Sequence, residues 1–309
     1  MRPEPAAGGV IELIAGEAAG RLDQWLAREL GLSRAAVQRA IAAGRVTVDG
    51  APADKSIAPA AGAVVCLEPE DTLPLQRQEP PVVTVLYADA HLALIDKPAG
   101  LPVYANAGQT GRATLADALR AQFPALATLA APEPRRPGMV HRLDADTSGI
   151  MVIGLDADTV WALQRQFHQR EPEKVYLALV HGHLPHERAL IEAPIGRHPR
   201  DRTRQAVARE GGREARTAYR VVEEWPTASL LEIDLLTGRT HQIRVHLASI
   251  GHPVVGDRTY GPRRSLPGAS RQLLHAWRLR LTHPVTGAAL QGEALVPDDM
   301  QQMIARLRG

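Results

Sequence analysis

The chain has 309 residues, which is enough for about two domains, and its 45% hydrophobic and 23% charged residues are typical of a globular protein. Its 36 basic residues nearly balance its 34 acidic ones, and Lys55, Lys97 and Lys174 are its only lysines, so arginine dominates the positive charge. The single cysteine, Cys66, excludes internal disulfides and thiolate metal cages. No segment reaches the roughly 20 apolar residues of a membrane span, and the first residues do not resemble a signal peptide. These features predict a cytoplasmic protein without a membrane partner.

The first 70 residues predict a small module of two helices and a sheet. Apolar residues recur at helical spacing over 21–30 and again over 37–41, and Ser33 is suited to cap the second helix. Short strands are expected at 45–48, before the turn dipeptide Asp49-Gly50, and at 63–67. A polar stretch with several prolines predicts a linker at 71–81, which leaves 82–309 as a second domain.

Arginines concentrate on this predicted helix pair, although the whole chain is nearly neutral. Together with the segment 44–50, they resemble the alpha-L, or S4-like, RNA-binding domain first seen in a small-subunit ribosomal protein. The sequence departs from that pattern at Gly62-Ala63, where many members carry an acidic residue after the glycine. A solvated basic helix face is the alternative interpretation. The resemblance implies RNA contacts from Arg21, Ser33, Arg34, Arg39 and Lys55.

Strand and helix patterns mix without regular alternation beyond residue 82. A hairpin is expected around Asp89-Ala90-His91, with a turn at 97–100 after it. Val160, Leu163 and Phe167 follow helical spacing. Further strands are expected at 175–180, 230–236 and 273–281. The pattern predicts an α+β domain with a mixed, mostly antiparallel sheet.

The pentapeptide Leu-Asp-Ala-Asp-Thr occurs twice, at 143–147 and at 155–159. The second copy precedes the helical pattern, so Asp156 or Asp158 is expected to cap a helix. The first copy leads into an apolar strand at 150–153, which places Asp144 and Asp146 on a loop between strands. Reactive groups are commonly displayed on such loops.

Metal sites fit the sequence poorly. Asp144 and Asp146 match the start of a calcium-binding EF-hand loop, but Leu155 stands where its bidentate glutamate belongs. A magnesium site built on the two aspartates usually accompanies a glycine-rich phosphate loop, and the sequence has no such fingerprint. No metal is therefore predicted, and the following histidines lack the spacing of metal ligands: His181, His183, His186, His241 and His246.

Four segments in order along the chain resemble the RluA-type pseudouridine synthases. They are 97–101, 141–149, 174–176 and 236–244, the last followed by Gly256-Asp257 and Tyr260-Gly261. The resemblance implies isomerisation of uridine in RNA to pseudouridine, with no metal or organic cofactor. It also implies that Asp144 is the essential carboxylate, which either acts on the sugar carbon or removes a sugar proton.

Both routes need the ionised carboxylate, and burial against a base would disfavour that form, so a cationic neighbour is physically useful. The resemblance assigns this role to Arg244. It implies that Tyr176 stacks on the target base and assists proton removal, and that Arg142 fills the gap left by the extruded uridine. Arg244 is expected in the first turn of a helix capped by Thr240, with an apolar side of Ile243, Leu247 and Ile250.

Arginines also accumulate between residues 188 and 220, a density that suits an arm gripping an RNA backbone. With Ile-Gly-Arg-His-Pro at 195–199, the chain resembles the RluD-type enzymes, which implies large-subunit (23S) ribosomal RNA as substrate, free or in an assembling subunit. A departure at 103–106, where many such members carry histidine and proline, keeps transfer RNA open as a target.

Two other function classes are open. One is a non-catalytic RNA-binding or assembly factor, which would have no physical need to keep Asp144, Tyr176 and Arg244 together. The other is a metal-dependent nucleotide enzyme that acts through Asp144 and Asp146. The second predicts loss of activity with a chelator, to which a cofactor-free isomerase is indifferent.

Overall fold

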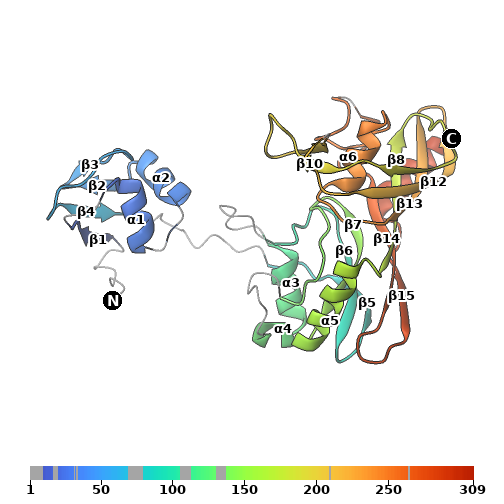
Figure 1. Ribbon diagram of the computed structural model, residues 1–309, viewed down its shortest axis with the longest axis horizontal. Helices are drawn as coiled ribbons and strands as arrows, with labels where there is room; N and C mark the ends of the chain where they lie inside the picture. The colour runs from blue at the N-terminus through green and yellow to red at the C-terminus, as the bar shows by residue number, and fades with distance from the viewer. Residues whose placement is uncertain are drawn as a thin grey trace. The chain divides into compact units, whose positions relative to one another are not determined.

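The computed structural model describes residues 10–16, 20–30, 32, 34–68, 79–104, 113–129, 137–208, 210–263 and 265–309. These residues fall into two compact units, one within 10–68 and one within 79–309, and each has its own apolar core (Figure 1). Ser33 and most of the expected linker lie outside the described residues.

The smaller unit is an antiparallel four-stranded sheet with two helices, and its apolar core includes Leu22, Leu26 and Val65. The two helices and the strands near 46 and 64 lie where the sequence predicts them. The strand β1 was not predicted, because its four residues are too few to show a clear alternation. The elements are β1 (Ile11–Ile14), α1 (Leu22–Leu30), α2 (Arg34–Ala42), β2 (Val46–Val48), β3 (Ala51–Pro52) and β4 (Val64–Leu67), and the strand order is β1-β4-β2-β3.

The larger unit is built on a nine-stranded sheet in which every neighbouring pair is antiparallel except β7 and β14, so the prediction of a mixed, mostly antiparallel sheet is confirmed. The order is β5-β6-β7-β14-β8-β13-β12-β9, and β15 pairs with β14. The strands are β5 (Thr84–Ala88), β6 (Leu92–Lys97), β7 (Ser148–Gly154), β8 (Glu173–His181), β9 (Arg188–Glu192), β12 (Arg216–Trp225), β13 (Ala228–Leu235), β14 (Leu274–Thr282) and β15 (Ala289–Glu293). A separate ribbon pairs β10 (Ile195–Arg197) with β11 (Gln205–Val207).

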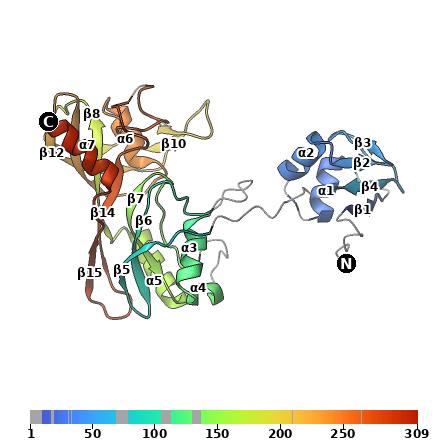
Figure 2. The ribbon, with the colours of Figure 1, turned by 180° about the vertical axis from the view of Figure 1, so that it is seen from behind.

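Both faces of this sheet are covered at β8, where alternate residues point to opposite faces and into different cores. Ala178 and Val180 of β8 belong to the main core, whereas Leu177 and Leu179 belong to a second core that includes residues of α7 (Asp298–Arg308). Figure 2 shows α7 against the strands on this second side. The other helices are α3 (Leu115–Gln122), α4 (Ala125–Thr128), α5 (Ala157–Gln169) and α6 (Gln242–Ser249).

Two helix starts test the predicted caps. Asp156 caps α5, since its side chain accepts a hydrogen bond from the Thr159 backbone N–H, as predicted. The prediction that Thr240 caps α6 is wrong: His241 occupies the cap position in the left-handed conformation, with φ 57°. Ile250, expected on the apolar side of that helix, lies at its C-cap and is 39% exposed.

The parallel pairing of β7 with β14 fixes the position of the loop that holds Asp144. Only Ser148 and Gly149 of β7 pair with β14, and Ala276, the partner of Gly149, also pairs with Tyr176 of β8. Gly149 has φ 118°, and a Cβ there would lie 2.1 Å from the Ala276 carbonyl oxygen, so only glycine fits. The loop before β7 therefore lies beside the start of β14 and near Tyr176.

Candidate active site

Asp144 and Arg244 come from distant parts of the chain and form an ion pair. Arg244 Nη1 donates a hydrogen bond to Asp144 Oδ2 at 2.8 Å. The same guanidinium donates from Nε and Nη2 to both oxygens of Asp257, at 2.6 and 3.0 Å. Arg244 and Asp257 are buried, whereas the Asp144 side chain remains 17% exposed. Asp257 thus fixes the plane of the guanidinium. The remaining hydrogen bond of Arg244 goes to Asp144, which a substrate can approach.

The charges in this chain of groups support one another. Burial opposes ionisation of Asp257, but the hydrogen bonds and charge of Arg244 outweigh it and hold the pKa of that carboxyl below its ordinary value. Burial also opposes the charge on Arg244, and its two carboxylate partners more than compensate, so its pKa is raised. The guanidinium therefore stays positive beside Asp144.

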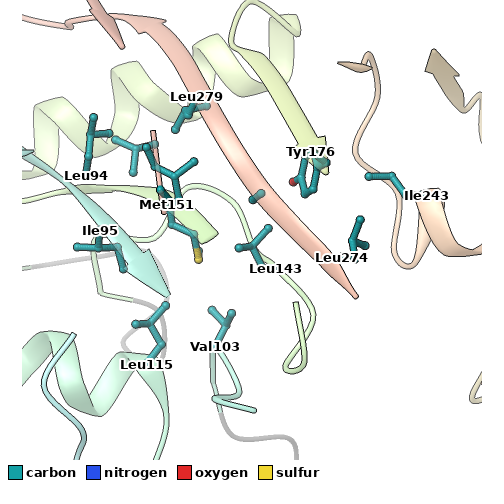
Figure 3. Close-up of a cluster of buried hydrophobic side chains, with 14 of the residues drawn as sticks. Leu94, Ile95, Val103, Leu115, Leu143, Met151, Tyr176, Ile243, Leu274 and Leu279 are labelled. Atoms are coloured by element: carbon teal, nitrogen blue, oxygen red, sulfur yellow. The ribbon is translucent and has the colours of Figure 1, made fainter. Parts of the chain in front are cut away.

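A cavity of about 110 Å³ opens next to Asp144. Figure 3 shows four of its apolar lining residues at one end of the main core cluster, where strands β8 and β14 and the start of α6 meet: Leu143, Tyr176, Ile243 and Leu274. Arg142 and His241 also line it. A cavity with an apolar wall beside a carboxylate is suited to a nucleobase whose sugar bond lies next to that carboxylate.

Tyr176 presents a buried ring to this cavity, with 7% of the residue exposed. Within the part of the chain that the structure describes, its hydroxyl has no hydrogen-bond partner. Burial and then the negative charge of Asp144 raise the pKa of Tyr176 above its ordinary value. The neutral phenol is favoured, and its buried ring is available to stack on a base.

Arg142 lies at the mouth of the same cavity and is exposed. Its Nη1 donates to the hydroxyl of Tyr104, and its guanidinium carbon lies 5.0 Å from the centre of the Tyr104 ring. Tyr104 belongs to the segment where the sequence departs from the RluD-type pattern. The cation predicted to replace the extruded uridine is therefore held by an aromatic residue.

Comparison with known proteins identifies the family. Residues 91–249 match the RNA pseudouridylate synthase family, and residues 20–62 match the S4 domain. The chain belongs to the RNA pseudouridine synthases. The resemblance in the sequence and the predicted enzyme class, an isomerase that acts on RNA, are thereby confirmed.

Several relatives align over most of their length. An uncharacterized RNA pseudouridine synthase of Chloroflexus aurantiacus is 44% identical over 303 residues, which cover 94% of this chain and 91% of the relative. The ribosomal large subunit pseudouridine synthase D of Nitrosomonas europaea is 42% identical, with 93% and 84% covered. Among solved structures, human RNA pseudouridylate synthase domain containing 4 has a TM-score of 0.58 at 25% identity, covering 73% of this chain and 93% of that one.

His241 is a site residue of the synthase that the sequence had suggested only as an unlikely metal ligand. Its Nδ1 lies 2.9 Å from the Tyr260 hydroxyl, and its Nε2 lies 3.8 Å from Asp144 Oδ2. Burial lowers its pKa. A left-handed backbone at a non-glycine residue costs about 1–3 kcal/mol and is often found at functional sites. No sequence signal apart from the matched family segment marks this conformation.

Lys97 is a second residue whose role was missed. It is fully buried, and its Nζ donates to the backbone carbonyls of Pro98, Leu101 and Ala145, at 2.8, 3.0 and 2.8 Å. Since Ala145 follows Asp144, this lysine ties the Asp144 loop to the end of β6. Burial lowers the pKa of Lys97 to about 7.

Lys97→Met should change how the stability of the synthase depends on pH. Between pH 7 and 10.5 the folded protein binds fewer protons at Lys97 than the unfolded chain does, so this residue makes the free energy of unfolding rise with pH. Methionine does not titrate, and the variant should lose that part of the slope. Urea unfolding at pH 7, 8 and 9 compares the two proteins, whose other titrating groups are the same. Parallel pH profiles would contradict the assignment.

The structure describes four of the five predicted RNA-binding residues of the smaller unit, and they differ in exposure and in partners. Arg21 and Arg34 bind the buried Asp23 at 3.2 and 2.9 Å, yet their side chains stay 46% and 51% exposed. Arg39 and Lys55 are exposed, and Ser33 lies outside the described residues. Asp23 orients two of the cations and offsets part of their charge.

Within the described ranges, no three histidine, cysteine, aspartate or glutamate side chains gather as metal ligands would. The same part of the chain contains no helix long and apolar enough to cross a membrane.

Proposed function

We propose that this synthase converts uridine to pseudouridine in large-subunit ribosomal RNA, with Asp144 as its catalytic carboxylate. In this proposal an RNA-docking domain at 1–70 is joined by the linker 71–81 to a catalytic domain at 82–309. The contact of Asp144 with the charged, buried Arg244 at the wall of a base-sized cavity carries the catalytic part. The relatives named ribosomal large subunit pseudouridine synthase D support the assignment of large-subunit ribosomal RNA as the substrate.

The reaction breaks the bond between uracil N1 and ribose C1′, turns the base, and joins C5 to C1′. The proton on C5 is then lost, and N1 gains one, so the product is an isomer of the substrate. On either open route, attack on C1′ or removal of the C2′ proton, Asp144 acts as an anion. Arg244 pairs with it through a hydrogen bond, Tyr176 and the apolar wall hold the base, and Arg142 takes the place of the base in the RNA stack.

Mapping pseudouridines in cells with and without the gene tests the choice of RNA. Loss of specific sites in large-subunit ribosomal RNA is the expected result. Loss of sites in transfer RNA alone would move the assignment to that substrate. Purified protein given free large-subunit RNA or assembling subunits then distinguishes the two forms of substrate.

The proposed RNA contacts of the smaller unit predict a change in salt dependence. Replacing Arg39 and Lys55 with alanine should weaken RNA binding and flatten the plot of log affinity against log salt by about one unit for each phosphate that is no longer neutralised. The control is Arg28→Ala, because Arg28 is exposed but paired with Glu29 at 2.9 Å. Filter binding at four salt concentrations measures the slopes, and equal slopes would remove the docking role from these two residues.

A further inference from the structure

A second cavity, of about 320 Å³, adjoins the base cavity. The two share Asp144, His241 and Arg244, but the rest of their linings differ. Leucines, an isoleucine and Tyr176 form an apolar wall of the first, beside its polar residues, whereas the second has no large apolar side chain of the described residues in its lining. Its polar and charged residues include Asp146, Arg258, Thr259, Ser270 and Gln272. Asp144 thus stands where the base cavity and this polar cavity meet.

The polar cavity has a rigid wall made by the turn around Gly256. Gly256 has φ 80°, and a Cβ there would lie 1.8 Å from the Arg271 carbonyl oxygen, so the turn packs directly on the backbone before β14. Asp257 Oδ1 accepts hydrogen bonds from the N–H groups of Thr259 and Tyr260, at 2.8 and 3.0 Å. The carboxylate that orients Arg244 therefore also fixes the turn that carries Arg258.

Three arginines line this cavity, and their charges are used differently. Arg244 is bound by Asp144 and Asp257, and Arg271 by Asp299 at 2.6 Å. Arg258 is exposed, and its one hydrogen bond among the described residues is donated by Nη2 to the Ser270 carbonyl at 3.0 Å. No carboxylate in that described part lies within 4.0 Å of it. Arg258 is thus anchored at one nitrogen while its other donors remain available to an external anion.

The chemistry of the reaction indicates which anion this is. The bond that breaks joins the base to C1′, so the acting carboxylate must stand between the base and the ribose. With uracil in the base cavity, the ribose and its phosphates extend into the polar one. An anion beside Asp146 would be repelled, which favours a position at Arg258 and the neutral Thr259.

We propose that the polar cavity holds the ribose-phosphate portion of the target nucleotide and that Arg258 binds one of the two phosphodiesters flanking it. This inference rests on the proposed role of Asp144. Arginine suits the task because its planar donors match phosphate oxygens in pairs. The contact fixes C1′ relative to Asp144 while the base turns.

The test pairs Arg258→Gln with RNA in which a methylphosphonate replaces one flanking phosphate. The substitution removes the positive charge of Arg258, and the methylphosphonate removes the negative charge of the phosphate. In a ribosomal RNA fragment that the protein modifies, Arg258→Gln should lower kcat/KM by about tenfold to a hundredfold. A methylphosphonate at the contacted position should lower kcat/KM of the wild-type protein by a similar factor. It should not lower kcat/KM of the variant any further. Arg263→Gln, an exposed arginine outside the cavity lining, is the matched control and should show the full methylphosphonate loss.

The proposal would be overturned if kcat/KM were unchanged in Arg258→Gln. It would also be overturned if the loss from Arg258→Gln and the loss from the methylphosphonate multiplied at both flanking positions. Thermal melting checks that the exposed substitution leaves the fold intact. Asp144→Asn, assayed in parallel, separates the two claims. If that variant is inactive and the losses still multiply, only the phosphate site fails, whereas an active Asp144→Asn refutes the catalytic assignment itself.

Discussion

Asp144→Asn should reduce pseudouridine formation by more than about a thousandfold while RNA affinity stays within a few fold of the wild type. The amide keeps the shape of the side chain and can still accept a hydrogen bond from Arg244, but it has no negative charge to act at the sugar. Nucleoside analysis of digested RNA measures the product, and filter binding measures the affinity.

The repeated pentapeptide supplies a matched control for this experiment. Asp156 is the counterpart of Asp144 in the second copy, where it caps α5. Asparagine caps helices about as well as aspartate, so Asp156→Asn should retain activity and nearly all stability. Near-normal turnover in Asp144→Asn would refute the assignment. Equal loss in both variants would show that the pentapeptide, and not its place in the fold, determines activity.

Arg244→Gln should damage activity and stability together. It leaves Asp257 buried without its cation, which costs about 3–5 kcal/mol in the free energy of unfolding. It also removes the positive charge beside Asp144, so product formation should fall by at least about a hundredfold, as expected for loss of one charged hydrogen bond near the reacting atoms. Urea unfolding and single-turnover assays at a temperature where the variant is folded measure the two effects.

A second substitution separates these effects. Adding Asp257→Asn to Arg244→Gln removes the unpaired charge, so it should restore much of the stability and none of the activity. Acidification should act in the same direction on the single variant. Without Arg244, burial raises the pKa of Asp257, the folded protein binds more protons there than the unfolded chain, and the stability deficit shrinks as pH falls. Recovery of activity in the double variant would contradict a direct role for Arg244.

The sequence predicted those features of the fold that depend on local patterns. The hairpin of β5 and β6, the strands β8, β13 and β14, and the helix after Asp156 all follow from periodicity and capping. Local patterns do not encode which strands pair, so the parallel contact of β7 with β14 was not predictable. The left-handed backbone of His241 has no residue signature, which explains the wrong cap at Thr240.

The candidate site was predicted only in part, for a related reason. The pairing of Arg244 with Asp144 joins residues 100 positions apart, and it was expected from the family segments rather than from any spacing. Lys97 and Asp257 lie within those segments, yet their roles depend on buried contacts that only the folded chain creates. The two copies of one pentapeptide show the same limit, since a local sequence takes its role from the elements around it.

The two-residue contact between β7 and β14 has a mechanical consequence. Within the sheet, this short strand pairing joins two halves, one made of β5, β6 and β7 and the other containing β8 and β13. Asp144 enters from the first half, whereas Tyr176 and Arg244 belong to the second. The ion pair of Asp144 with Arg244 therefore bridges this boundary, as do the hydrogen bonds from Arg271 and Gln272 to residues 146 and 147, so the packing that joins the two halves also sets the distance between the carboxylate and the guanidinium.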